Sequence, residues 1–307
     1  MILRTAHRAV GKLSLMRGEE ISMRTCAAMV LLVLLASACG DKSKESDADY
    51  AARMALEHKA DTPKASPAAQ AGAAAPIRSQ TVRYATVNGK EVSGYLAYPA
   101  AAEGGLPAVL VFHEWWGLND NIKSMADQLA GQGYVALAAD LYGGQVATQP
   151  EAARSLMEEA LKDRDAMGQN LRQAHAYLKE QIKATRIGTI GWCFGGAISL
   201  RAALVVPDQV DATIIYYGHV GSDPEELKPL KAPVLGLFGG ADQGIPVEMV
   251  RKFEDTLKGL GKPVTIHIYE GAAHAFANPS GGNYKADAAA DAWSKSLAFL
   301  AEHLKGG

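Results

Sequence analysis

A cysteine lies between closely spaced small residues in the run Ile190–Gly196 (IGWCFGG), directly after an apolar, β-prone stretch. This spacing is typical of a nucleophile elbow, a tight strand-to-helix turn in which the residues two before and two after the nucleophile must be small. Gly191 and Gly195 meet that requirement. The turn would place Cys193 at the amino end of a helix, where the helix dipole favours the thiolate. The pattern predicts acyl transfer by a cysteine nucleophile. A buried structural cysteine in a glycine-rich turn is the alternative.

A cysteine nucleophile needs a base, and the base needs a third group that orients it. In elbow enzymes the acid and then the histidine follow the nucleophile along the chain. Asp242 and His274 each come just after a predicted strand, so we expect them to form this pair above the sheet. The other downstream histidines fit less well, because His219 precedes the acid, His267 lies within a strand and His303 lies in the last helix. The alternatives are a surface-loop histidine and a helix-capping aspartate.

The loop after the third predicted strand of the folded body reads His113-Glu114-Trp115-Trp116. In elbow enzymes this loop gives one backbone N–H to the oxyanion hole and the residue after the nucleophile gives the other, which nominates Trp115 and Phe194. The Glu114 carboxylate would be partly desolvated by the two tryptophans, so its protonation state matters. A role in ordering the loop is the alternative. No second ligand follows His113-Glu114 at metal spacing, and we expect neither a metal nor an organic cofactor.

The elements that position these residues are predicted to be strands and helices that alternate along the chain. Eight β-prone runs are predicted, at residues 81–87, 92–98, 108–113, 134–141, 187–192, 212–217, 234–238 and 264–269. Amphipathic, helical stretches are predicted near residues 121–132, 150–184, 196–205, 246–260 and 286–303. The first two strands read as a hairpin around Asn88-Gly89.

An antiparallel pair followed by such alternation predicts an α/β fold of the α/β-hydrolase layout. Right-handed crossovers would give a mostly parallel sheet with helices on both faces. In such sheets ligands bind at the carboxyl ends of the strands, which is where Cys193, Asp242 and His274 are expected.

The N-terminal quarter of the chain is predicted to hold a targeting segment and a spacer. Residues 1–22 fit no signal and suggest a mis-assigned start, with translation from Met23. Residues 23–39 resemble a bacterial lipoprotein signal peptide, with the lipobox Leu35-Ala36-Ser37-Ala38-Cys39, although Ala36 stands where leucine is preferred. Cleavage would leave a lipidated Cys39, so we expect export and anchoring to a bacterial membrane, facing the periplasm. An ordinary signal peptide is the alternative.

Residues 40–76 are rich in Ala, Lys, Asp, Ser and Pro and predict a flexible tether, with a weak helix around residues 51–58. Residues 77–307 form the predicted catalytic domain.

Composition narrows the class of protein. The chain has 307 residues, of which 48% are hydrophobic and 21% are charged, and its formal net charge is −2. This charge does not favour nucleic acid as a partner, and a small neutral or anionic ligand fits better. Cys26 and Cys39 lie in the leader, so Cys193 is alone in the folded body. A disulfide within the domain is therefore excluded, and a thiol redox protein would lack a resolving cysteine.

Six motifs together carry a resemblance that extends over about residues 81–304. They are His113-Glu114, Asp140-Leu141-Tyr142, Gly191-Trp192-Cys193-Phe194-Gly195-Gly196, Tyr216-Tyr217-Gly218, Gly240-Ala241-Asp242 and Ala273-His274-Ala275-Phe276. With them the chain resembles the dienelactone hydrolase (carboxymethylenebutenolidase) family. The resemblance implies a cofactor-free hydrolase of small lactones, esters or thioesters with a Cys193-His274-Asp242 triad. It also implies that Glu114 contacts the resting, neutral thiol and takes up its proton when substrate binds.

The resemblance is incomplete where the family binds a substrate carboxylate. The family's positive side chain four residues after the catalytic histidine is replaced by Asn278. A second arginine of the family corresponds to Arg154, for which a solvated helix face is the alternative. We therefore retain a second hypothesis, a membrane-tethered binding or scaffold protein with little turnover. The oligomeric state stays open.

Overall fold

The structure is a computed structural model, and it describes residues 47–59, 72–102 and 104–306. One eight-stranded sheet runs through this part of the chain, in the order β1-β2-β4-β3-β5-β6-β7-β8. Its strands are β1 (Ile77–Val87), β2 (Lys90–Pro99), β3 (Ala108–Phe112), β4 (Val135–Ala139), β5 (Ile187–Trp192), β6 (Ala212–Tyr216), β7 (Val234–Gly239) and β8 (Val264–Tyr269). β2 pairs antiparallel with β1 and β4, and all other neighbours are parallel.

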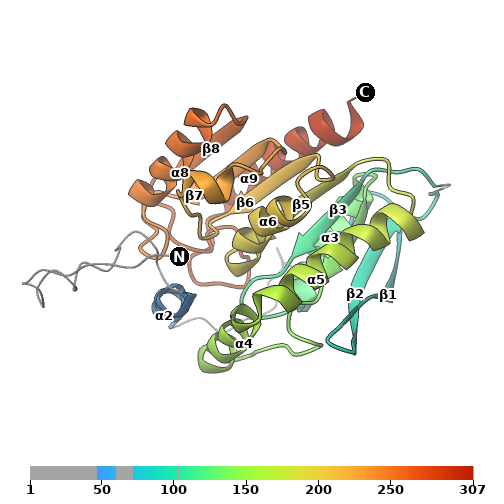
Figure 1. Ribbon diagram of the computed structural model, residues 1–307, viewed down its shortest axis with the longest axis horizontal. Coiled ribbons are helices and arrows are strands. Elements are labelled where there is room, and N and C mark those ends of the chain that lie inside the picture. The colour runs from blue at the N-terminus through green and yellow to red at the C-terminus, as the bar shows by residue number, and fades with distance from the viewer. Residues whose placement is uncertain (1–46, 60–71, 103, 307) are drawn as a thin grey trace, which may run out of the picture. The chain divides into compact units, whose positions relative to one another are not determined.

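The central strands are apolar on both faces because helices cover both sides of the sheet (Figure 1). Every residue of β3, β4, β5 and β6 is buried, as is typical of parallel strands between two helical layers. The helices are α2 (Asp47–Glu57), α3 (Asp120–Gly131), α4 (Pro150–Lys162), α5 (Arg164–Ala176), α6 (Phe194–Val205), α7 (Pro224–Leu227), α8 (Val247–Gly259) and α9 (Ala286–Leu300), with π-helical turns η2 (Tyr177–Gln181) and η3 (Ala301–Lys305). This architecture confirms the predicted α/β-hydrolase fold class.

Two glycines of β5 show which helices lie on which face. Gly188 and Gly191 are three residues apart, so they face opposite sides of the sheet. A Cβ on Gly188 would contact Leu300 and Leu304 at the end of the chain, whereas a Cβ on Gly191 would meet the backbone of α6 at Gly195. The C-terminal helices and α6 therefore cover opposite faces.

The hairpin between β1 and β2 has the turn that its sequence predicts. Asn88 and Gly89 have φ angles of 49° and 75°, and positive φ at both central residues is what a two-residue hairpin turn requires. The pairing of Val87 with Lys90 across this turn fixes the register of the two strands.

The predicted helical stretch near residues 150–184 is instead two helices and a π-helical turn. Asp163 separates α4 from α5, with φ −104° and ψ 82°, and its side chain accepts a hydrogen bond from the backbone N–H of Ala166. An aspartate that caps a new helix at its amino end also interrupts the preceding one.

α2 lies within the region predicted to be a tether, where the sequence predicted a weak helix around residues 51–58. The helix begins at Asp47 and buries Tyr50, Ala51 and Met54. It packs beside α4 (Figure 1). The predicted start, signal peptide and lipidated Cys39 fall within residues 1–46, outside the described residues. No helix in the described part of the chain is long and apolar enough to cross a membrane.

Candidate active site

The elbow at Cys193 has the strained backbone that its sequence predicts. β5 ends at Trp192 and α6 begins at Phe194, so one residue makes the whole turn. Cys193 has φ 55° and ψ −119°, a conformation that costs energy for a residue with a side chain and that clusters at functional sites. A Cβ on Gly191 would collide with the carbonyl oxygen of Gly195, and one on Gly195 would collide with that of Phe112. Both positions therefore require glycine.

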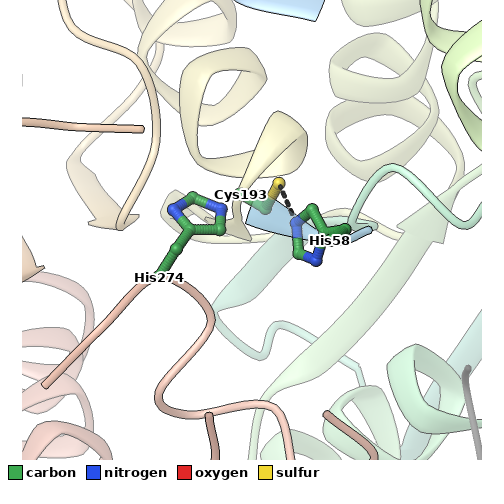
Figure 2. Close-up of side chains that lie close together, drawn as sticks. All are labelled: His58, Cys193 and His274. Atoms are coloured by element: carbon green, nitrogen blue, oxygen red, sulfur yellow. Dashed lines mark hydrogen bonds between the residues drawn. The ribbon is translucent and has the colours of Figure 1, made fainter. Parts of the chain in front are cut away.

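Asp242 and His274 meet as predicted, although they are far apart in sequence. His274 Nδ1 donates to Asp242 Oδ2 at 2.8 Å, and both side chains are fully buried. The other carboxylate oxygen accepts from the backbone N–H of Ile245 at 2.8 Å. Asn283 Nδ2 donates to the carbonyl oxygen of His274 at 3.0 Å and anchors its loop. The Asp242 contact leaves Nε2 of His274 as the ring nitrogen that faces Cys193 (Figure 2).

The charges of this cluster favour a thiolate. Burial of Cys193 opposes ionisation, but the charge of His274 and interactions with His274 and His58 outweigh it and lower the pKa of the thiol to about 6. For His274, burial favours the neutral ring, yet the charges of Cys193 and Asp242 outweigh it and raise the pKa well above its usual range. Both shifts favour the thiolate–imidazolium form of the pair. The neutral resting thiol that the family resemblance implies stays a prediction.

Glu114 is buried and is held by the residue that replaces the family's positive charge. Asn278 Nδ2 donates to Glu114 Oε2 at 2.6 Å, and Asn278 Oδ1 accepts from the backbone N–H of Ser280 at 2.8 Å. The amide of Asn278 is thereby engaged with Glu114 instead of presenting a positive charge to a substrate carboxylate. Its role as a substrate-binding residue stays a prediction.

Arg154 lies apart from these contacts. Its Nε forms an ion pair with Glu158 Oε1 at 2.8 Å, one turn further along α4, and its side chain is 45% exposed. This arrangement fits the alternative of a solvated helix face.

The predicted oxyanion donors flank the elbow. Phe194 is the first residue of α6, and the first N–H groups of a helix have no partner within that helix. Trp115 lies in the turn after β3 that is closed by the hydrogen bond from Gly117 N to Glu114 O. Trp115 and Trp116 are both buried. Their hydrophobic bulk keeps water from this side of the nucleophile and strengthens local electrostatic interactions.

Two residues that the sequence analysis did not nominate contact the cysteine sulfur. Met54 Sδ lies 3.8 Å from Cys193 Sγ. His58 Nε2 lies 3.6 Å from the same sulfur (Figure 2). The His58 ring stacks on Trp115 with centroids 4.6 Å apart and meets the His274 ring edge-on at 5.1 Å.

The sequence does hold a signal for a buried helical face here, although it does not show what that face contacts. Tyr50, Met54 and His58 are spaced four residues apart, which places them on one face of a helix. The surrounding polar and alanine-rich composition concealed this short periodicity. The three side chains are at most 4% exposed, so the face they form is buried.

α2 leaves little room for a substrate beside Cys193. Gly244 shows how closely α2 is seated, because a Cβ there would lie 2.6 Å from Met54 Cε. Cys193 itself has no exposed surface. The structure is therefore a closed form of the site.

The sheet order and the elbow between β5 and α6 match the α/β-hydrolase fold. A family model described as the dienelactone hydrolase family matches residues 92–304. The chain belongs to the dienelactone hydrolase family, and it is a hydrolase of that type.

Similar proteins agree with this assignment. A protein of Aquifex aeolicus, provisionally named a carboxymethylenebutenolidase, is 33% identical over 225 residues, which cover 71% of this chain and 96% of the relative. A provisionally named carboxymethylenebutenolidase of Methylorubrum extorquens is 37% identical over 219 residues, covering 66% of this chain and 74% of the relative. The solved structure of a provisionally named dienelactone hydrolase from Klebsiella pneumoniae superposes with a TM-score of 0.66 at 26% identity, covering 74% of this chain and 99% of that one.

Proposed function

We propose that the protein hydrolyses small activated esters, thioesters or lactones through a thioester formed on Cys193. His274 serves as the base and Asp242 orients it. The observation that carries this proposal is the buried 2.8 Å contact between His274 Nδ1 and Asp242 Oδ2, with the other ring nitrogen facing the elbow cysteine. This is the geometry that nucleophilic acyl transfer requires.

The reaction proceeds in two halves. The Cys193 thiolate attacks the substrate carbonyl carbon, and the oxyanion is stabilised by the backbone N–H groups of Phe194 and Trp115. His274 Nε2 gives its proton to the departing alkoxide as the C–O bond breaks. Water then attacks the thioester while the same nitrogen takes its proton, and the carboxylate product leaves with the thiolate restored. For a lactone, the alcohol and the acid are parts of one product molecule.

Substrate entry in this scheme requires α2 to move, because Met54 and His58 lie against the nucleophile. A closed form excludes water and oxidants from a reactive thiolate. We infer that α2 exchanges between this closed form and an open one, and that only the open form binds substrate.

The proposal is tested by turnover of p-nitrophenyl esters and simple lactones by the full chain and by Cys193→Ala. We expect the variant to stay folded and to lose at least about a thousandfold in turnover, because the nucleophile is gone. Undiminished turnover by folded Cys193→Ala would contradict the cysteine mechanism. The alternative of a scaffold without turnover finds no support in the comparisons.

A further inference from the structure

Three metal-ligating side chains converge where α2 meets the elbow. Cys193, His274 and His58 each place one ligand atom within 4.8 Å of the other two, and all three residues are buried (Figure 2). Two of them belong to the proposed hydrolytic machinery, whereas His58 comes from the turn directly after α2. One thiolate and two imidazoles form a donor set that suits thiophilic cations.

The spacing is close to that of a metal site. Zinc bonds of about 2.3 Å to sulfur and about 2.0 Å to nitrogen place these ligand atoms about 3.5 Å apart in a tetrahedron. Cys193 Sγ and His58 Nε2 lie 3.6 Å apart. His274 would complete the set with a side-chain shift of at most about 1.3 Å, the difference between the observed 4.8 Å limit and a separation of about 3.5 Å.

A second observation points to a ligand at the same place. Nε2 of His274 is buried and has no hydrogen-bond partner among the described residues. Its other nitrogen donates to Asp242 at 2.8 Å. A histidine that binds a metal through one nitrogen while donating to a carboxylate through the other is the usual arrangement in metalloproteins.

We propose that Cys193, His274 and His58 bind a thiophilic cation, Zn²⁺ or Cu⁺, which holds α2 over the nucleophile and blocks hydrolysis. The blocking effect, unlike the binding, rests on the proposed function. One metal–sulfur and two metal–nitrogen bonds form as the ion releases the water or chelator ligands that it carried. The Nε2 proton of His274 passes to solvent, and no electron is transferred. Turnover stops because the nucleophile and the base are both ligands, and it resumes when the ion is removed.

Met54 distinguishes the two ions. Its thioether lies 3.8 Å from Cys193 Sγ, and thioethers are soft donors that bind Cu⁺ well, whereas zinc is held by thiolate, imidazole and carboxylate. Met54→Leu keeps the apolar bulk and removes the sulfur donor. If the ion is Cu⁺, this variant weakens its binding by about tenfold or more, and if the ion is Zn²⁺ its affinity stays within about threefold.

Binding is measured on the full chain with Zn²⁺, with Co²⁺ as its spectroscopic substitute, and with Cu⁺, each in competition with a chromophoric chelator. The test variant is His58→Gln, and the matched control is His303→Gln at the C-terminal turn. We expect a cobalt–thiolate absorption band and tight binding in the wild type and the control, with affinity for the ion lower by about tenfold or more in His58→Gln. The proposal would be overturned if His58→Gln bound Zn²⁺ as tightly as the wild type does and also bound Cu⁺ as tightly. It would also be overturned if the wild type showed neither a cobalt–thiolate band nor Cu⁺ binding.

Inhibition is measured in the same proteins. The quantity compared is the metal concentration that halves the hydrolysis rate each protein has without metal. We expect this concentration to rise about tenfold or more in His58→Gln and to stay unchanged in the control. Equal inhibition of His58→Gln and wild type would show that α2 takes no part. If the ion binds through His58 but no protein turns over any ester or lactone, the metal site stands and the proposed function fails.

Discussion

Burial alone would keep the Cys193 thiol protonated, and the neighbouring imidazoles reverse that preference. Burial raises the pKa of the thiol, but the charge of His274 is the main effect that outweighs burial and lowers the pKa to about 6. Thiolate therefore predominates above about pH 6 and is lost as the pH falls through that value. The thiolate and imidazolium stabilise each other, so removing either charge shifts the pKa of the remaining partner back toward its ordinary value.

We predict that the ultraviolet absorbance of the thiolate, with Cys193→Ala as the blank, titrates with a midpoint near pH 6. In His274→Asn the midpoint rises, because the positive charge that favours the thiolate is gone. Turnover of the wild type should fall as the pH drops below this midpoint. A wild-type midpoint near 8.5, the usual value for cysteine, would contradict the ion pair.

Glu114 gives a separate prediction at this scale. If its carboxylate takes part in proton transfer during substrate binding, Glu114→Gln lowers kcat/KM by roughly two to four decades, as general acid–base groups do. The amide keeps the size and can still pair with Asn278. Steady-state kinetics on a p-nitrophenyl ester measures the effect. Near-wild-type kcat/KM would mean that Glu114 only orders the tryptophan loop.

The sequence allowed the triad residues to be predicted because the elbow spacing and the chain order of acid and histidine are local or ordered signals. The contact of His58 with Cys193 has no such signal, since the two residues lie 135 positions apart. The hydrogen bond from Asn278 to Glu114 spans 164 positions. Which polar groups meet across such distances depends on packing that a single sequence does not specify.

At the scale of elements, α2 is held over the site by its buried face. Tyr50 and Met54 are buried, whereas Leu56 on the same helix is 73% exposed. Removing a fully buried methionine side chain costs about 2–5 kcal/mol in a well-packed core. A loss of this size would favour the proposed open form by a factor of about ten or more.

We predict that Met54→Asp opens the site, because a carboxylate at this buried position is costly to desolvate. KM should fall by about tenfold or more, since the closed form competes with substrate and each 1.4 kcal/mol is a factor of ten. Leu56→Asp is the matched control and should leave KM unchanged. Steady-state kinetics compares the two variants, and the same KM in both would show that α2 does not gate the site.

The strands were predictable as elements because each is a short apolar run between turn residues, and β5 and β8 have the predicted bounds. The division between α4 and α5 was missed because Asp163 lies within a continuous amphipathic pattern. α2 was underestimated for another reason. A helix of modest length and polar composition is not stable alone. α2 is stabilised by packing against α4 and against Cys193.

For the whole molecule, we propose that the chain is exported and anchored by a lipid on Cys39. The support is the apolar run and lipobox of residues 23–39. We predict that Cys39→Ala moves the enzyme from the membrane fraction to the soluble fraction without changing its kcat or KM. Mass spectrometry of the membrane-extracted wild type should show an acylated Cys39 at the N-terminus. A mature protein that begins at Met1 or Met23 would contradict the anchor.

The central claim is that hydrolysis passes through a thioester on Cys193, and the most direct measurement is the mass of that intermediate. His274→Ala is mixed with p-nitrophenyl acetate, quenched in acid and analysed by intact-protein and peptide mass spectrometry. We predict one added acetyl group on the peptide that contains Cys193, because the variant lacks the base that activates water for thioester hydrolysis. An acetyl group on another residue, or none in His274→Ala while folded Cys193→Ala still turns over the ester, would contradict the account.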